Sequence, residues 1–87
     1  MMNNTTNTLP KELNDLDVGP DSEYVSNMFT GERCFLPPVA VAIYDFIIGA
    51  QLISHTEMFD SKVRKEMQIG LNWFKKHYPR EYMTLLD

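Results

Sequence analysis

The most apolar stretch of the sequence, Val39 to Ser54, reads VAVAIYDFIIGAQLIS and directly follows two prolines. Proline is favoured in the first turn of a helix, so this stretch predicts a helix. At about 100° per residue, its apolar side chains fall on two sides. The main stripe contains Val39, Ile43, Phe46, Ile47, Ala50 and Ile53, and the second stripe contains Val41, Ile48 and Leu52. One neighbouring helix cannot cover both stripes, so the rest of the chain or another molecule must cover the second.

Length and composition predict one small domain with a packed core. The chain has 87 residues, of which 44% are hydrophobic and 11% aromatic. A chain of this length buries only roughly 60 to 65% of the surface that it would expose when unfolded, so we expect a thin margin of stability. Cys34 is the single cysteine, which excludes an intrachain disulfide and favours a reducing intracellular compartment.

No targeting or membrane segment is recognised in the sequence. Residues 1–8 are uncharged and rich in Asn and Thr, whereas a secretory signal has a basic start and an apolar run. The apolar stretch is shorter than the about 20 residues that span a bilayer, and it contains Asp45. We therefore expect no membrane among the partners.

The net charge of −4 is unevenly divided along the chain. Residues 1–60 carry nine acidic and two basic side chains, whereas residues 61–87 carry six basic and three acidic ones. Either the acidic part folds back onto the basic part, or one of them faces a charged partner. We favour the internal arrangement. The acidic whole and the scattered basic residues argue against a nucleic-acid partner.

Residues 1–36 predict an acidic N-terminal arm. Leucines at helical spacing indicate a short amphipathic helix near its start, and Gly19-Pro20 ends it. A second short helix is expected from Asp21 or Ser22 to Phe29. The alternative is a hairpin, with strands at Tyr24–Phe29 and Arg33–Leu36 joined through Thr30-Gly31. The leucines concerned are Leu9, Leu13 and Leu16.

Residues 37–87 predict a helical domain. After the apolar helix, a second helix capped by Ser54 or Asp60 runs to about His77, and Pro79 begins a short terminal helix. Gly49 and Ala42 are expected to allow a close approach between helices. We therefore predict an all-α fold of two antiparallel helices and a short C-terminal helix, crossed by the N-terminal arm. The core face of the second helix contains Phe59, Val63, Met67, Gly70, Leu71, Phe74 and Tyr78.

Two apolar surfaces are candidates for binding a partner protein. Met58, Ile69 and Trp73 lie opposite the core face of the second helix, framed by lysines, and Trp is common among residues that dominate binding energy. The alternative is that Trp73 is covered by its own chain and belongs to the core. The other candidate surface is the second stripe of the apolar helix: Val41, Ile48 and Leu52.

No motif predicts catalysis. Cys34, His55 and His77 have no surrounding signature of a nucleophile pair, and they are too few and too scattered for a structural zinc site. Asp45 is interpreted as a side chain at the helix margin rather than a buried functional carboxylate. We therefore expect no enzyme, no metal or other cofactor and no small-molecule substrate.

Three segments together resemble small uncharacterised proteins of tailed bacteriophages. They are PVAVA with the following YD (38–45), GLNWF (70–74) and YPREYMTLLD (78–87), and the resemblance covers residues 30–87. It implies a viral context, in the host cytoplasm or the virion, and no catalytic residues. We therefore expect a non-enzymatic accessory protein that binds another protein, modulates a host protein or self-associates. The alternative is a capsid or tail component whose arm is ordered by a neighbour.

Overall fold

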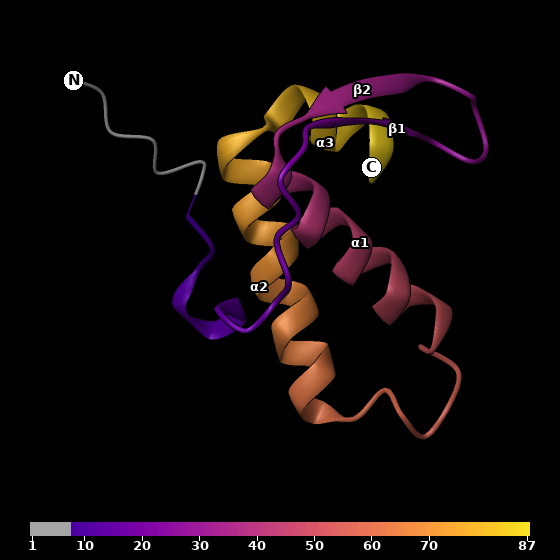
Figure 1. Cartoon of the computed structure of the whole chain (residues 1–87). Coiled ribbons are helices and arrows are strands. Elements are labelled where there is room, and N and C mark those ends of the chain that lie inside the picture. Colours follow the sequence, from indigo (N-terminus) through magenta and orange to yellow (C-terminus); the bar gives the residue numbers. More distant parts are fainter. Residues whose placement is uncertain (1–7) are drawn as a thin grey trace.

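The computed structural model describes residues 8–87, so the expectations for residues 1–7 lie outside it. Figure 1 shows two long helices that run in opposite directions, with a two-stranded hairpin across one end. A short third helix lies beside the hairpin. In chain order the elements are the 3-10 helix η2 (Lys11–Leu13), strands β1 (Glu23–Ser26) and β2 (Arg33–Leu36), and helices α1 (Pro38–Leu52), α2 (Ser61–His77) and α3 (Pro79–Leu85).

The helix boundaries follow the sequence signals closely. Pro37 is extended, with φ −72° and ψ 166°, and precedes the first residue of α1. The carboxylate of Asp60 accepts a hydrogen bond from the Val63 N–H at 2.9 Å, which satisfies one of the free donors at the start of α2. Pro79 then begins α3 directly after α2. These are the expected proline start and aspartate cap.

The prediction of an all-α fold is wrong, because β1 and β2 pair as an antiparallel hairpin. The expected helix from residue 21 to Phe29 is replaced by β1 and the hairpin loop. Val25 lies opposite Cys34 and both are half-buried, whereas Tyr24 and Phe35 lie opposite each other and are exposed. This alternation turns one face of the hairpin toward the core and the other toward solvent.

Gly70 lies where α1 and α2 pack against each other. A Cβ atom at this position would be 3.4 Å from Ile43 Cγ2 and from Ile47 Cγ1. Ile43, Ile47 and Phe74 are fully buried around this contact. Gly49, where a close approach was expected, is exposed and has open space around its Cα. The small residue that matters for helix packing is therefore on α2, because α1 turns Gly49 to solvent.

The first part of the N-terminal arm, before the hairpin, packs on α2. Helix η2 packs on α2, where Leu13 is 2% exposed. The chain then crosses the long helices to reach the hairpin, as Figure 1 shows. Within residues 8–87, the one ion pair joins Lys62 and Glu66, which both belong to α2. No acidic side chain of the arm in this part of the chain therefore forms an ion pair with α2. The hydrogen bond that Lys62 donates to the Glu66 carboxylate is the main cause that raises the pKa of Lys62, and nearby Asp15 adds a smaller contribution.

Enlarging Gly70 should separate α1 from α2. We expect Gly70→Leu to lower the free energy of unfolding by about 1–3 kcal/mol, because an isobutyl group would displace Ile43 and Ile47. Gly70→Ala should be neutral or stabilising by up to about 1 kcal/mol, because the added methyl only reaches contact distance and glycine is a poor helix former. Urea denaturation measures both, and Gly49→Leu is the control in open space. Equal stability of the two leucine variants would contradict this packing.

Candidate protein-binding groove

The second stripe of α1 loses its cover along the length of the helix. Val41, near the hairpin end, is 8% exposed, whereas Ile48 is half-buried and Leu52 is 74% exposed. Strand β1 packs against α1, but the cover stops before the last turn of the helix. Within residues 8–87, the second stripe is therefore covered only in part, since it is buried at Val41 and exposed at Leu52.

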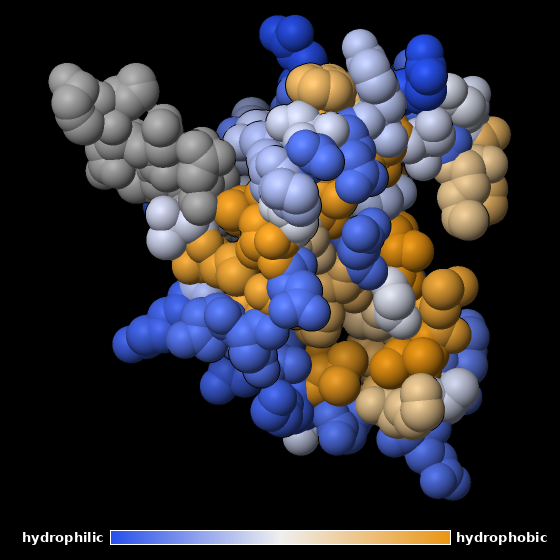
Figure 2. Space-filling model, in the orientation of Figure 1, coloured by the Kyte–Doolittle hydropathy of each residue, from blue (hydrophilic) through white to orange (hydrophobic). Residues whose placement is uncertain are grey.

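A groove with a volume of about 310 Å³ opens beside the uncovered part of α1. The hairpin loop overhangs one side of this groove, and the last turn of α3 closes another. Figure 2 shows the hollow between the tip of the hairpin and the apolar side of α1. We call it the apolar groove, and its walls contain Asn27, Met28, Phe29, Tyr44, Ile48, Gln51, Leu52, Leu85, Leu86 and Asp87.

Large apolar side chains stand exposed around the apolar groove. Phe29 is 93% exposed, Met28 is 72% exposed, and Leu52 faces them from α1 with 74% exposed. Single exposed apolar residues are common on protein surfaces, but a contiguous group beside a hollow marks a site of interaction. The groove therefore combines a hollow with exposed apolar walls.

Asn27 holds the hairpin loop in place over the groove. Its Oδ1 accepts hydrogen bonds from the N–H groups of Phe29, at 2.7 Å, and Thr30, at 3.2 Å, and its Nδ2 donates to the carbonyl oxygen of Thr84 at 2.8 Å. Gly31 closes the loop with φ 79°, a conformation that favours glycine, and its N–H donates to the Asn27 carbonyl. The exposure of Phe29 thus belongs to a loop with a defined conformation.

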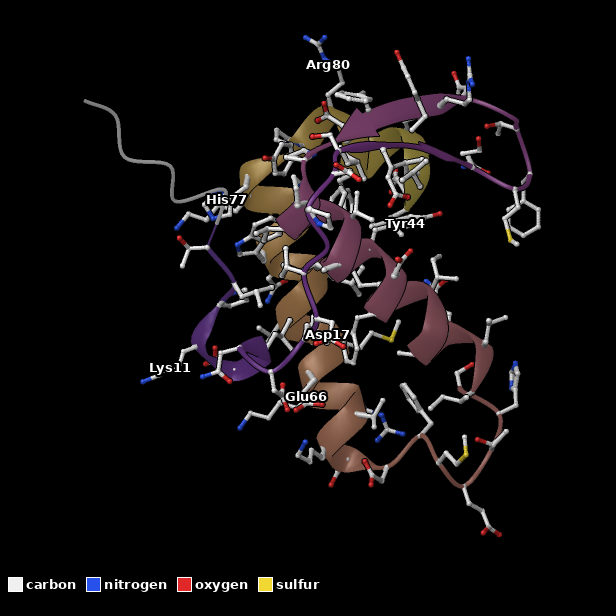
Figure 3. The ribbon with its side chains drawn as sticks, in the orientation of Figure 1. Lys11, Asp17, Tyr44, Glu66, His77 and Arg80 are labelled. Atoms are coloured by element: carbon white, nitrogen blue, oxygen red, sulfur yellow. The ribbon has the colours of Figure 1, made fainter. Side chains whose placement is uncertain are left out.

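Tyr44 supplies a polar group to the floor of the groove. The residue is 7% exposed, and burial, with a smaller contribution from Asp45, raises the pKa of its hydroxyl. Figure 3 places Tyr44 on the side of α1 that lies beneath the hairpin. Asp45 itself is exposed at the helix margin, as the sequence indicated. At neutral pH the Tyr44 hydroxyl is therefore a neutral hydrogen-bonding group.

The structure does not unite Met58, Ile69 and Trp73 into one exposed surface. Met58 is 62% exposed in the connection between α1 and α2, whereas Ile69 is half-buried and Trp73 is 8% exposed. The Trp73 ring lies 5.0 Å from that of His77 and 5.8 Å from that of Tyr78, centroid to centroid. Trp73 is thus part of the core, which was the alternative left open by the sequence.

Of the second predicted surface, Ile48 and Leu52 line the groove and Val41 does not. The sequence reasoning missed Met28 and Phe29, because it assigned them to the apolar side of a helix. Their position directly before the Thr30-Gly31 turn was the available signal, since apolar residues at a hairpin tip cannot reach the core of a small domain.

The surroundings of Cys34 do not activate its thiol. Burial raises the pKa of the Cys34 thiol, which is opposite to the shift that activates a nucleophilic cysteine. Within residues 8–87, no group of three or more His, Cys, Asp or Glu side chains is arranged to hold a metal ion. In the same part of the chain, no helix combines the length and apolarity needed to cross a membrane.

Comparisons of this chain with known protein families, curated protein sequences and solved structures gave no match.

Replacing Trp73 tests its place in the core. We expect Trp73→Ala to lower the free energy of unfolding by about 3–5 kcal/mol, because it empties a space that three other aromatic rings surround. Met58→Ala, at an exposed position, should change it by less than about 0.5 kcal/mol. Chemical denaturation followed by circular dichroism measures both. A Trp73→Ala variant as stable as the control would place the indole at the surface.

Removing the Asn27 side chain tests whether it fixes the loop. Asn27→Ala should speed amide hydrogen exchange at Phe29 and Thr30 and lower the free energy of unfolding by about 1 kcal/mol, since three hydrogen bonds are lost. Asn27→Asp keeps the acceptor oxygen but cannot donate to Thr84, so it should preserve the slow exchange in the loop. Unchanged exchange in Asn27→Ala would show that Asn27 does not order the loop.

Proposed function

We propose that this protein acts by binding another protein, and that the apolar groove is the binding site. The observation that supports this proposal is the convergence of Phe29, Met28 and Leu52, all largely exposed, around one hollow. Burying one side chain of this size contributes about 1.5–3 kcal/mol. A partner that covers the three of them would therefore gain a central apolar contact of the kind that dominates protein interfaces.

The size and lining of the groove favour a protein over a small molecule. Its volume of about 310 Å³ is at the lower end of ligand pockets, which span about 300–1,000 Å³. Its most prominent wall, the side chain of Phe29, projects into solvent with 93% of its surface exposed. A small ligand would leave much of this ring uncovered, whereas a protein surface can enclose it.

The proposed activity is non-enzymatic, and the resemblance of residues 30–87 to small phage proteins makes a host protein the first partner to test. In this proposal the chain modulates its target by occupying a surface on it. The Trp73 side chain takes no direct part, because its own chain covers it.

Site-specific photo-crosslinking in the cells where the protein acts tests the site. A benzoylphenylalanine placed at Leu52 should yield a crosslinked product after irradiation, and the same group at Met58 should not. The two positions are matched, with 74% and 62% of the side chain exposed, but only Leu52 lines the groove.

Mass spectrometry of the product identifies what is bound. A polypeptide other than this chain attached at Leu52 supports the proposal. The absence of any product at Leu52, or identical products at both positions, would refute it.

A further inference from the structure

The charge around the apolar groove has one sign. Asp87 is the charged residue in its walls, and Asp45 precedes Ile48 and Leu52 by three and seven residues, which places it on the same side of α1. Both carboxylates are exposed, and neither has an ion-pair partner within residues 8–87. The groove is therefore apolar in its centre and acidic at its margin.

Within residues 8–87, no lysine or arginine forms an ion pair with Asp45 or Asp87. Helix α1 contains no lysine or arginine. The guanidinium of Arg33 lies over the ring of Tyr24, 5.0 Å from its centroid, on the exposed face of the hairpin. Figure 3 places Lys11 and Arg80 at the periphery of the molecule, away from Tyr44. An occupant that carries positive charge would therefore find unpaired carboxylates beside an apolar surface.

The backbone of the hairpin loop has few free donors for an added strand. The N–H groups of Phe29 and Thr30 donate to Asn27 Oδ1, that of Gly31 donates to the Asn27 carbonyl, and that of Glu32 donates to Thr30 Oγ1. The facing wall is α1, whose backbone groups bond within the helix. An extended peptide needs backbone partners to add to a sheet, whereas a helix satisfies its own backbone.

The volume of the groove suits side chains from one helix. Its 310 Å³ is about twice the roughly 150 Å³ of an apolar cavity that accepts benzene, so it has room for about two large side chains. Residues three or four apart on a helix lie about 5–6 Å from each other and can enter one hollow together.

We propose, on the basis of the protein-binding function above, that the groove takes an amphipathic helix of a partner protein whose apolar stripe is flanked by lysine or arginine. Two apolar side chains of that helix enter between Phe29 and Leu52. Its basic residues meet Asp45 and Asp87 at the margin. The acidic margin also opposes a second copy of this chain in the same groove, because the two copies would bring like charges together.

A pair of synthetic helical peptides, each of about 18 residues with identical leucine positions, tests the proposal, since isolated helices much shorter than this are marginal. The polar face is lysine in one peptide and glutamate in the other. The full chain, labelled with nitrogen-15, is titrated with each peptide and followed by two-dimensional NMR. We expect the lysine peptide to shift the amides of Phe29, Leu52 and Leu86, and to bind at least about tenfold more tightly than the glutamate peptide, because Asp45 and Asp87 attract lysine and repel glutamate.

Two matched double variants distinguish the effect of the carboxylates at the groove margin on affinity from the effect of the net charge of the protein. Asp45→Asn with Asp87→Asn should weaken the lysine peptide by about three- to tenfold, as expected for two exposed charge pairs. Glu12→Gln with Asp17→Asn removes the same charge from exposed positions in the N-terminal arm and should leave its affinity nearly unchanged. Leu52→Ser should weaken both peptides.

Each contrary outcome has a distinct meaning. Equal binding of the two peptides at the groove would overturn the proposal of a basic partner helix but leave the protein-binding function standing. Shifts confined to residues 8–22, before the hairpin, or equal losses in both double variants, would show attraction by net charge alone and would also overturn it. Absence of binding by either peptide, together with a crosslink at Leu52 to a second copy of the chain, would assign the groove to self-association instead.

Discussion

The two-sided apolar character of α1 is the constraint on which the rest of the structure depends. One side is satisfied by α2, where Gly70 lets the helices approach until a Cβ atom would lie 3.4 Å from Ile43 and Ile47. Within residues 8–87, the other side has no second long helix to cover it. In a chain of 87 residues with a thin margin of stability, isoleucine and leucine side chains left exposed to water do not contribute to the free energy of unfolding. The packing of the remaining segments therefore decides how much of this stripe is buried.

The hairpin is a partial solution to this constraint. It is short, and two strands cannot form a stable sheet alone, so it persists because Val25 and Leu36 pack on the helical core and Asn27 ties its loop to α3. Strand β1 packs against α1, whose second stripe is buried at Val41 and exposed at Leu52. The same element that completes the core at one end of α1 therefore creates the overhang of the groove at the other end.

The sequence predicted α1, α2 and α3 because each has a start signal and a periodic apolar face: prolines at residues 37, 38 and 79, and the Asp60 cap. The sequence allowed either a helix or a hairpin before residue 37, because Tyr24 and Val25 fit a helix as well as a strand when only their neighbours in the sequence are considered. The distinction depends on pairing with Cys34 and Phe35 and on burial against α3, which are tertiary contacts.

The groove was half predicted, through Ile48 and Leu52, and its other half depended on the hairpin. Trp73 could not be placed from periodicity, because it lies on the side of α2 opposite the predicted core face and its burial depends on tertiary contacts.

The exposure of Phe29 on an ordered loop is hard to explain by folding stability. A loop of the same length closed by Asn27 and Gly31 would be equally well bonded with a polar residue at position 29, and the phenylalanine ring buries almost nothing, with 93% of it exposed. An ordered loop does, however, reduce the conformational entropy that a partner must overcome when it binds. The hydrogen bonds of Asn27 then have two consequences. They stabilise the hairpin, and they hold an aromatic ring beside Leu52 before any partner arrives.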